Sequence, residues 1–370
     1  MKRVMVTLFM IIFMVSTAFS AGPFQPILTD VANIPELEDL NLIKRDELLT
    51  FGNSLTKLYF WDLNSRDSIN KNFPIELNGK LLTQPITQRI FNDGLNYLTY
   101  CVEGIEGNIY FHCIDFKGSE YPGFPLLLQD KPVTTPVFLL IETNVYIMYS
   151  TESGQVIYFD LTHSLIPEEH HSIQTSGTDT EIYLKDISGD TQKELICKTY
   201  ITENYYVIEY YEYLNEVWEL SSNSLDFTGE IGSNLLFLDV TGDNIEEVIF
   251  GDSTGQLFIY SIFPNFTLIP NYPKVISNGS IEIINYIHGN TVAVTDSRKN
   301  TYEISLDSFS KEKILDRKYA NQYSNYSLST YLDIPGFTGI VNYFTRFGSD
   351  VTIIKDTGEL EKWGYFNHSI

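Results

Sequence analysis

The sequence has few of the features by which disulfide-rich proteins and many enzyme families are recognised. It contains only three cysteines in 370 residues, too few for a disulfide scaffold. It has no G-x-S-x-G nucleophile elbow, no H-E-x-x-H metal motif, no Walker loop and no dinucleotide fingerprint. Helical periodicity is almost absent, and the best candidate, residues 34–49, is broken by Pro35 and reads equally well as strand. The chain therefore matches neither a disulfide scaffold nor the common motif-bearing enzymes.

Positive charge is also scarce. The chain has 24 lysines and arginines against 48 aspartates and glutamates, a net charge of −24. A surface of this kind repels nucleic acid and anionic lipid and favours cations, so we expect no nucleic-acid partner. The 25 tyrosines and 24 phenylalanines supply ample material for a core despite this charge.

The sequence has one long apolar segment, which lies at its N-terminus. Two basic residues precede an apolar run over 4–15, and Ala18-Phe19-Ser20 fits a small-x-small cleavage site. The run is too short for a good membrane span, although an uncleaved anchor is the alternative. We predict a signal peptide over 1–20 and a single domain over 21–370. The mature chain would be exported (secreted, periplasmic or on the cell surface) with no transmembrane segment after cleavage.

The stretch 239–260, DVTGDNIEEVIFGDSTGQLFIY, is the most informative part of the chain. It predicts an acidic loop, a short apolar strand over 247–250, a tight turn over 252–255 and a second strand over 257–260. A second copy of the acidic loop, DISGDTQKEL, starts at Asp186. Two copies in one chain indicate a repeat protein.

Each acidic loop carries side-chain oxygens at its positions 1, 3, 5 and 9. Oxygen ligands at this spacing suit a hard cation such as calcium. A turn held by side-chain-to-backbone hydrogen bonds, with no metal, is the alternative. The candidate ligands are Asp239, Thr241, Asp243 and Glu247 in one loop, and Asp186, Ser188, Asp190 and Glu194 in the other.

The turn-then-strand half of the opening stretch recurs along the whole chain. Matches begin at 56, 107, 154, 204, 255, 300 and 358, separated by 51, 47, 50, 51, 45 and 58 residues. Seven units of this length predict an all-β fold, a seven-bladed β-propeller with four-stranded blades. In such a fold each of these anchors would begin a strand in the outer half of its blade.

An aromatic-proline step recurs soon after a strand pair. Proline cannot donate to a central ladder, so we expect these steps at blade edges or in the connections between blades. The aromatic residue is held extended and can pack between neighbouring blades. The alternative is three chance pairs in a chain rich in tyrosine and phenylalanine. The steps are Asn72-Phe73-Pro74, Gly123-Phe124-Pro125 and Asn271-Tyr272-Pro273.

Two of the three cysteines flank a predicted hairpin turn around 104–107. Cys101 and Cys113 could therefore face each other across two strands and form a disulfide. We favour the alternative of two buried thiols. Cys197, next to Ile196 in a predicted strand, is expected to be a core thiol.

The acidic loops and the strand pair that follows the second of them resemble the FG-GAP or VCBS-type repeat, which builds the propeller of integrin α-chains and of many exported proteins. The resemblance is good across 186–196 and 239–262 and faint in the other units. In that family the acidic loops bind calcium, which would implicate the two ligand sets above. The family usually has glycine after the third ligand, where this chain has Thr191 and Asn244. Asparagine tolerates the left-handed backbone better than threonine, so 239–247 is the better candidate.

The resemblance and the missing catalytic motifs together imply a non-catalytic binding propeller. We expect a monomer that binds a protein or polysaccharide and is stabilised by calcium. One alternative is a carbohydrate-active enzyme, a glycosidase or lyase, with carboxylates at the central channel. Another is a scaffold for envelope assembly. Inward carboxylates with tyrosines at a channel mouth would favour the enzyme, whereas an apolar patch or exposed strand edge would favour protein binding.

Overall fold

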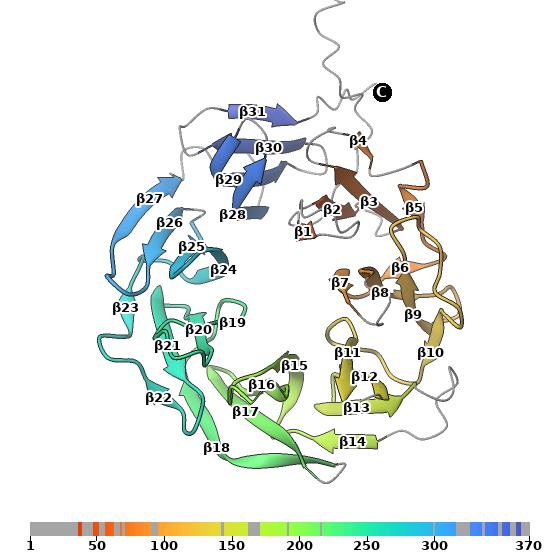
Figure 1. Ribbon diagram of the computed structural model, residues 1–370, viewed down its shortest axis with the longest axis horizontal. Helices are drawn as coiled ribbons and strands as arrows, with labels where there is room; N and C mark the ends of the chain where they lie inside the picture. The colour runs from red at the N-terminus through yellow and green to blue at the C-terminus, as the bar shows by residue number, and fades with distance from the viewer. Residues whose placement is uncertain are drawn as a thin grey trace, which may run out of the picture.

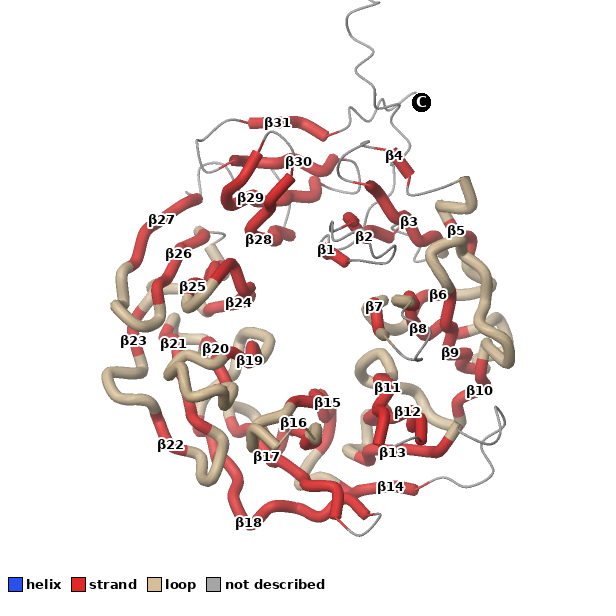
Figure 2. Tube along the Cα trace, viewed as in Figure 1, coloured by secondary structure: helices blue, strands red, loops and turns tan. Residues whose placement is uncertain are grey.

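The computed structural model describes residues 36–38, 47–51, 56–62, 67–68, 71–89, 95–141, 144–161, 171–190, 192–214, 217–298, 300–315, 326–334, 337–346, 350–355 and 360–363. All regular structure in these residues is β-strand, with no helix (Figure 2). The predicted all-β class is therefore confirmed. None of the described segments is an apolar helix long enough to span a bilayer. The predicted signal peptide, 1–20, lies outside the described residues.

Consecutive strands pair antiparallel into sheets that follow one another along the chain. In two sheets the third strand pairs with the fourth strand and also with a short additional strand. These additional strands are β5, which pairs with β3, and β23, which pairs with β21. The first three sheets contain β1 (Glu36–Glu38), β2 (Glu47–Phe51), β3 (Lys57–Asp62), β4 (Asp67–Ser68) and β5 (Ile75–Glu76); β6 (Lys80–Leu81), β7 (Ile86–Gln88), β8 (Tyr97–Glu103), β9 (Ile109–Ile114) and β10 (Leu126–Leu128); and β11 (Val137–Ile141), β12 (Asn144–Ser150), β13 (Gln155–Asp160) and β14 (His171–Gln174).

The remaining sheets continue in the same order. They contain β15 (Thr178–Lys185), β16 (Glu194–Thr202), β17 (Tyr205–Leu214) and β18 (Val217–Thr228); β19 (Leu236–Leu238), β20 (Glu247–Gly251), β21 (Gln256–Ser261), β22 (Thr267–Leu268) and β23 (Lys274–Val275); β24 (Ile281–His288), β25 (Thr291–Asp296), β26 (Thr301–Ser305) and β27 (Lys311–Leu315); and β28 (Tyr326–Ile334), β29 (Phe337–Arg346), β30 (Asp350–Lys355) and β31 (Leu360–Trp363).

The sheets lie side by side around a common centre (Figure 1). Strands β1, β7, β11, β15, β19, β24 and β28 lie nearest that centre, and the last strand of each sheet lies at the rim. The first six sequence anchors fall at or just before β3, β9, β13, β17, β21 and β26, each the third strand out from the centre. The seventh, at 358, precedes the fourth strand, β31. The third strand of that sheet is β30, so the alignment of the sequence repeat is displaced by one strand in the seventh unit.

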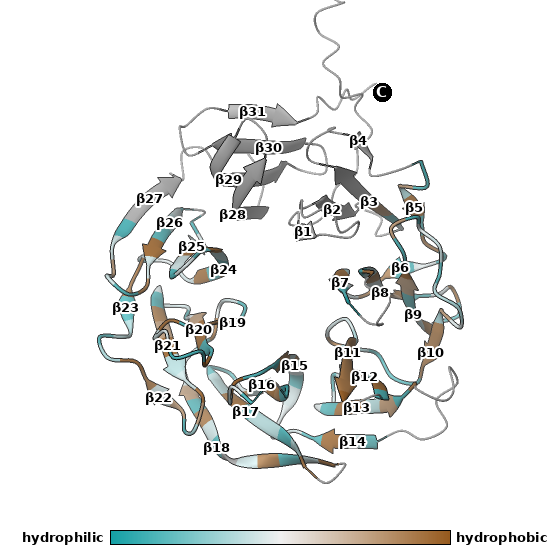
Figure 3. Ribbon diagram, in the orientation of Figure 1, coloured by the Kyte–Doolittle hydropathy of each residue, from teal (hydrophilic) through white to brown (hydrophobic). Residues whose placement is uncertain are grey.

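The apolar run of β20 forms a strand that is covered on both faces. In β20 every residue from Glu247 to Gly251 is buried, and β20 and β11 are among the most hydrophobic strands in Figure 3. Neighbouring residues in a strand point to opposite faces. Phe250 therefore packs with Ile196 of the preceding sheet, while Ile249 packs with Ile284 of the following sheet. The core is thus divided into layers, each lying between two consecutive sheets.

Glycine is required where the hairpin between the second and third strands meets the next sheet. Gly154 and Gly255 have φ of 79° and 86°, and their carbonyls accept hydrogen bonds from the N–H groups of Thr175 (3.0 Å) and Ile276 (2.8 Å). A Cβ on Gly255 would lie 2.3 Å from the carbonyl oxygen of Ser277. The connecting segment therefore runs directly against the hairpin, where no side chain fits.

The aromatic-proline steps occupy equivalent places, as expected. Phe73, Phe124 and Tyr272 are buried, and each is joined to its proline by a cis peptide bond. The strands that follow them, β5, β10 and β23, each pair with the third strand of their sheet. Tyr272 packs between two sheets, and its hydroxyl donates a hydrogen bond to the carbonyl of Leu306 in the next sheet (2.7 Å).

Cys101, Cys113 and Cys197 are buried thiols, which agrees with the favoured interpretation. On the paired strands β8 and β9, Cys101 lies opposite Phe111, and Cys113 lies opposite Thr99. The two cysteines are therefore offset along the ladder and do not face each other directly, and both belong to the apolar layer shared with the following sheet.

Candidate functional site

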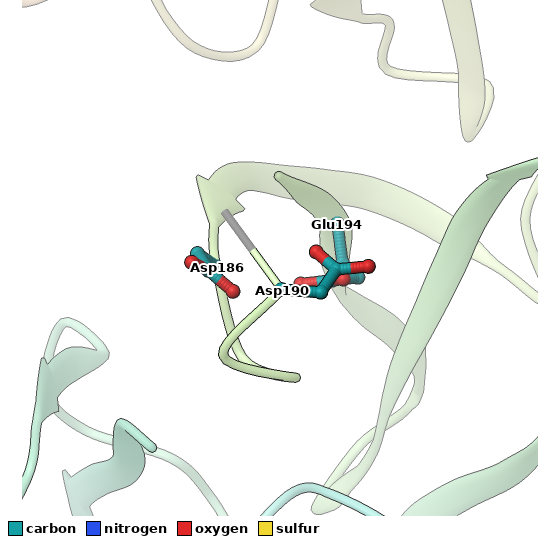
Figure 4. A group of neighbouring side chains, drawn as sticks. All are labelled: Asp186, Asp190 and Glu194. Carbon is teal, nitrogen blue, oxygen red and sulfur yellow. The ribbon is translucent and has the colours of Figure 1, made fainter. Parts of the chain in front are cut away.

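The first acidic loop connects β15 to β16. Asp186 follows the last residue of β15, and Glu194 is the first residue of β16. One carboxylate oxygen from each of Asp186, Asp190 and Glu194 lies within 4.8 Å of the other two (Figure 4). Asp190 is exposed, Asp186 is half-buried and Glu194 is buried. The loop thus presents a converging set of carboxylates that opens to solvent at Asp190.

Glu194 ties the loop back onto the strand that follows it. Its carboxylate accepts hydrogen bonds from the backbone N–H of Ile187 (2.7 Å) and from the hydroxyl of Ser188 (2.9 Å). Burial raises the pKa of Glu194, and these two donors act in the opposite direction. The predicted ligands Ser188 and Glu194 are therefore already paired with each other.

The second acidic loop, between β19 and β20, holds its carboxylates with a similar set of hydrogen bonds. Asp239 accepts three from backbone N–H groups, of Gly242 (2.6 Å), Asp243 (3.1 Å) and Asn244 (2.8 Å), where Asp186 accepts one from Gly189 (2.8 Å). Glu247 accepts hydrogen bonds from the N–H groups of Val240 (2.7 Å) and Thr241 (3.3 Å). The trio at 239, 243 and 247 is not gathered at the spacing of the first loop, although all its residues are described.

The predicted turn geometry is present in this second loop. Asn244 has φ of 68°, the left-handed conformation expected after the third ligand position. Thr191, the equivalent residue of the first loop, lies outside the described part of the chain. Thr241 Oγ1 donates to Glu247 (3.2 Å), as Ser188 does to Glu194.

The two acidic loops are neighbours. Lys185 Nζ at the start of the first loop lies 3.5 Å from the carboxylate of Glu246 in the second. A Cβ on Gly189 would lie 3.8 Å from Ile245. The two loops therefore lie together on one face, at the junction of two sheets. The three carboxylates gathered within the first loop repel one another, and a bound hard cation would offset the repulsion.

A pocket lies at the opposite end of β15 and β16. Its volume is about 570 Å³, and it opens between the sheet of β15–β18 and the segment that leads into β19. Lys198, only 7% exposed, donates a hydrogen bond from Nζ to Glu181 Oε1 (2.8 Å), and its Nζ lies 5.9 Å from the centre of the Tyr206 ring. The lining residues are Asp179, Glu181, Lys198, Tyr200, Tyr206, Ile231, Gly232, Ser233 and Asn234.

The pocket carries more negative than positive charge. Asp179 is exposed at its wall, and the second oxygen of Glu181 accepts a hydrogen bond from the hydroxyl of Tyr183 (2.7 Å). Burial, and after it the charge of Glu230, raises the pKa of Tyr206. The pocket is thus polar, weakly acidic and partly lined by aromatic rings.

Sequence reasoning did not identify this pocket. The one feature of the sequence that pointed to the pocket was a charged residue inside an apolar strand, Lys198 in the run LICKTY. The register Glu181↔Lys198 places the two charges opposite each other on neighbouring strands. The pairing comes from the sheet and is not visible in local sequence.

No family model matches the sequence, and no curated protein matches it either. Solved structures do match it. BBS1N, in a crystal structure in complex with ARL6DN, is 12% identical, with 94% of this chain and 96% of that chain covered and a TM-score of 0.55. Sqt1 from Saccharomyces cerevisiae is also 12% identical, with 91% and 86% covered and a TM-score of 0.54. The fold is propeller-like. At this identity the similarity extends to the fold alone.

Proposed function

We propose that this chain is an exported, seven-bladed β-propeller of the FG-GAP or VCBS type that binds a protein or polysaccharide without changing it chemically. The described strands group into seven antiparallel sheets, each with at least four strands. Their order around a common centre and the repeat of about 50 residues support one blade per sheet.

We propose that calcium binds the acidic loops and stiffens the two blades that carry them. The converging carboxylates of Asp186, Asp190 and Glu194 make the first loop the stronger candidate on geometry. The sequence had favoured the second loop because Asn244 suits the turn. In the second loop Asp239 accepts three backbone hydrogen bonds, so its carboxylate offers fewer lone pairs to a cation.

The pocket next to Lys198 is the observation that carries the binding function. Ligand sites in proteins are concave, usually about 300–1,000 Å³, and combine apolar surface with a few placed polar groups. This pocket meets that description with two tyrosines, a buried lysine and exposed Asp179. The pocket lies on the face opposite the acidic loops. A calcium ion bound in those loops would therefore support the blade and would not contact the ligand.

Binding is favoured over hydrolysis because of how Glu181 is held. A glycosidase needs one carboxylate that can give a proton and a second that can take one or attack. Both oxygens of Glu181 already accept hydrogen bonds, one from Lys198 and one from Tyr183. Held in this way, Glu181 suits a structural role.

A protein ligand is favoured by a second feature, the hairpin of β17 and β18. Leu214 and Val217 lie opposite each other next to its tip and are 44% and 49% exposed. An exposed apolar pair on a hairpin suits contact with another protein. A pull-down in which Leu214→Ser loses the captured partner would support this surface.

The test of the proposed function is a ligand screen on mature protein. Glycan arrays and pull-downs, each with calcium and with chelator, should identify a ligand that is recovered unchanged. Release of a cleaved product from a bound polysaccharide would favour the enzyme instead. A screen in which neither glycan nor protein binds above background would overturn the proposal.

A further inference from the structure

We propose that the pocket between β16 and β19 binds an uncharged sugar residue of a polysaccharide. This inference rests on the proposed binding function and narrows its ligand. The decisive feature is the combination in one pocket of an aromatic pair, a buried ammonium group and an exposed carboxylate.

The hydrogen-bonding groups of the pocket match hydroxyls, which both donate and accept. Lys198 Nζ has three protons and gives one to Glu181, which leaves donors for a ligand. Asp179, exposed at the wall, can only accept. Neighbouring hydroxyls on a sugar ring can accept from one group and donate to the other at the same time.

The aromatic pair offers a surface for the apolar face of a sugar ring. Tyr200 and Tyr206 are half-buried, with ring centres 5.6 Å apart and ring planes at 72°. The two rings therefore meet edge to face and form a corner in the lining of the pocket. Tyrosine combines an apolar face with a polar tip, which suits a ligand that has both kinds of surface.

The charge of the pocket argues for an uncharged ligand. Lys198 is the only cation among the lining residues, and Glu181 already neutralises it at 2.8 Å. Asp179 then leaves a net negative wall on a chain whose net charge is −24. An anionic sugar would meet repulsion from this wall and would gain no unpaired cation.

The experiment compares neutral saccharides with a negatively charged one. Calorimetric titration of the mature chain would use neutral tetrasaccharides of glucose, mannose, galactose and N-acetylglucosamine, and tetragalacturonate as the charged counterpart of tetragalactose. At least one neutral ligand should bind, with little change in affinity between low and high salt. Tetragalacturonate that binds as tightly as the best neutral ligand would overturn the inference.

Variants locate the site. Asp179→Asn keeps the side-chain shape, and asparagine tolerates the φ of 47° at this position. Losing a charged acceptor should weaken sugar binding about tenfold. Tyr200→Ala should weaken it by at least as much. Matched controls are Glu219→Gln and Tyr286→Ala, both exposed and outside the pocket, which should bind like the wild type.

The outcomes separate this inference from the broader proposal. If the pull-down recovers a protein partner but no saccharide binds, the sugar inference is overturned and the binding function stands. If saccharide binding survives Asp179→Asn and Tyr200→Ala unchanged, the pocket is the wrong site. If neither protein nor saccharide binds, both proposals fail.

Discussion

The side-chain amide of Asn234 makes two hydrogen bonds to the backbone of Ile284 in the next sheet. Its Nδ2 donates to the carbonyl oxygen and its Oδ1 accepts from the N–H, each at 2.9 Å. Gln88 makes an equivalent bridge, donating to the carbonyl of Pro136 (2.9 Å) and accepting from the N–H of Phe138 (3.0 Å). Each amide therefore links neighbouring sheets near the inner strands.

Removing this bridge should destabilise the fold. We expect Asn234→Ala to lower the free energy of unfolding by about 1–2 kcal/mol, because two backbone groups lose a partner that water can only partly replace. Denaturant unfolding would measure the change. Asn223→Ala, which removes one exposed hydrogen bond to the carbonyl of Pro264, is the control and should cost less than about 1 kcal/mol. Equal costs would show that the bridge has no special role.

Substituting the hairpin glycine Gly255 should lower the stability of the fold more than substituting a turn glycine that has open space around it. Gly255→Ala combines left-handed strain with a clash, since Cβ would lie 2.3 Å from the carbonyl oxygen of Ser277. Gly107→Ala is the matched control, with φ of 80° and open space around the added carbon. We expect about 1 kcal/mol of loss at Gly107 from strain alone and clearly more at Gly255, measured as melting temperatures.

Calcium should stabilise the protein through the acidic loops. A ligand at 100 times its dissociation constant adds about 2.7 kcal/mol to stability, so chelation should lower the melting temperature. Asp190→Ala should remove most of this effect, because Asp190 belongs to the gathered cluster. Asp243→Ala should remove less, and Glu219→Gln none. Identical melting curves with calcium and with chelator would show that both loops are ordinary acidic turns that bind no calcium.

Without bound metal, the two buried glutamates of the acidic loops should lower the stability of the fold as the pH rises above the ordinary pKa of glutamate. Burial raises the pKa of Glu194 and of Glu247 above 4.5, so folding favours their protonated forms. Their stabilising contribution is present below the unfolded pKa and is lost as pH rises through the folded pKa. A double variant with Glu194→Gln and Glu247→Gln should show a flatter profile of unfolding free energy against pH. Added calcium should oppose the loss in the wild type only.

All three thiols should be unreactive in the native protein. Cys101, Cys113 and Cys197 are buried, and burial raises the pKa of Cys101 and Cys197, so the reactive thiolate is scarce. Thiol titration should find none in native protein and three after unfolding without reductant. A count of one in the unfolded protein would reveal the Cys101–Cys113 disulfide.

Much of the fold could be predicted from local sequence because its repeating unit is local. A turn followed by a strand-forming run specifies a hairpin, and six of the seven such runs fell at or just before the third strand of a sheet. The acidic loops and the left-handed turn at Asn244 could also be predicted, since each depends on neighbours in the chain. The seventh unit was misaligned because the outer strand at Leu360–Trp363 imitates the pattern.

The tertiary structure alone decided how residues of different sheets meet. The two acidic loops look alike in sequence, and Asp186 and Asp239 both accept backbone hydrogen bonds, yet of these two loops the first alone gathers its three carboxylates. The pocket required the pairing of Glu181 with Lys198 and a wall from the next sheet. The sequence by itself determined which strands form. Packing between sheets determined which polar groups of different sheets meet, as Asn234 and Ile284 do, because such groups lie about 50 residues apart in the chain.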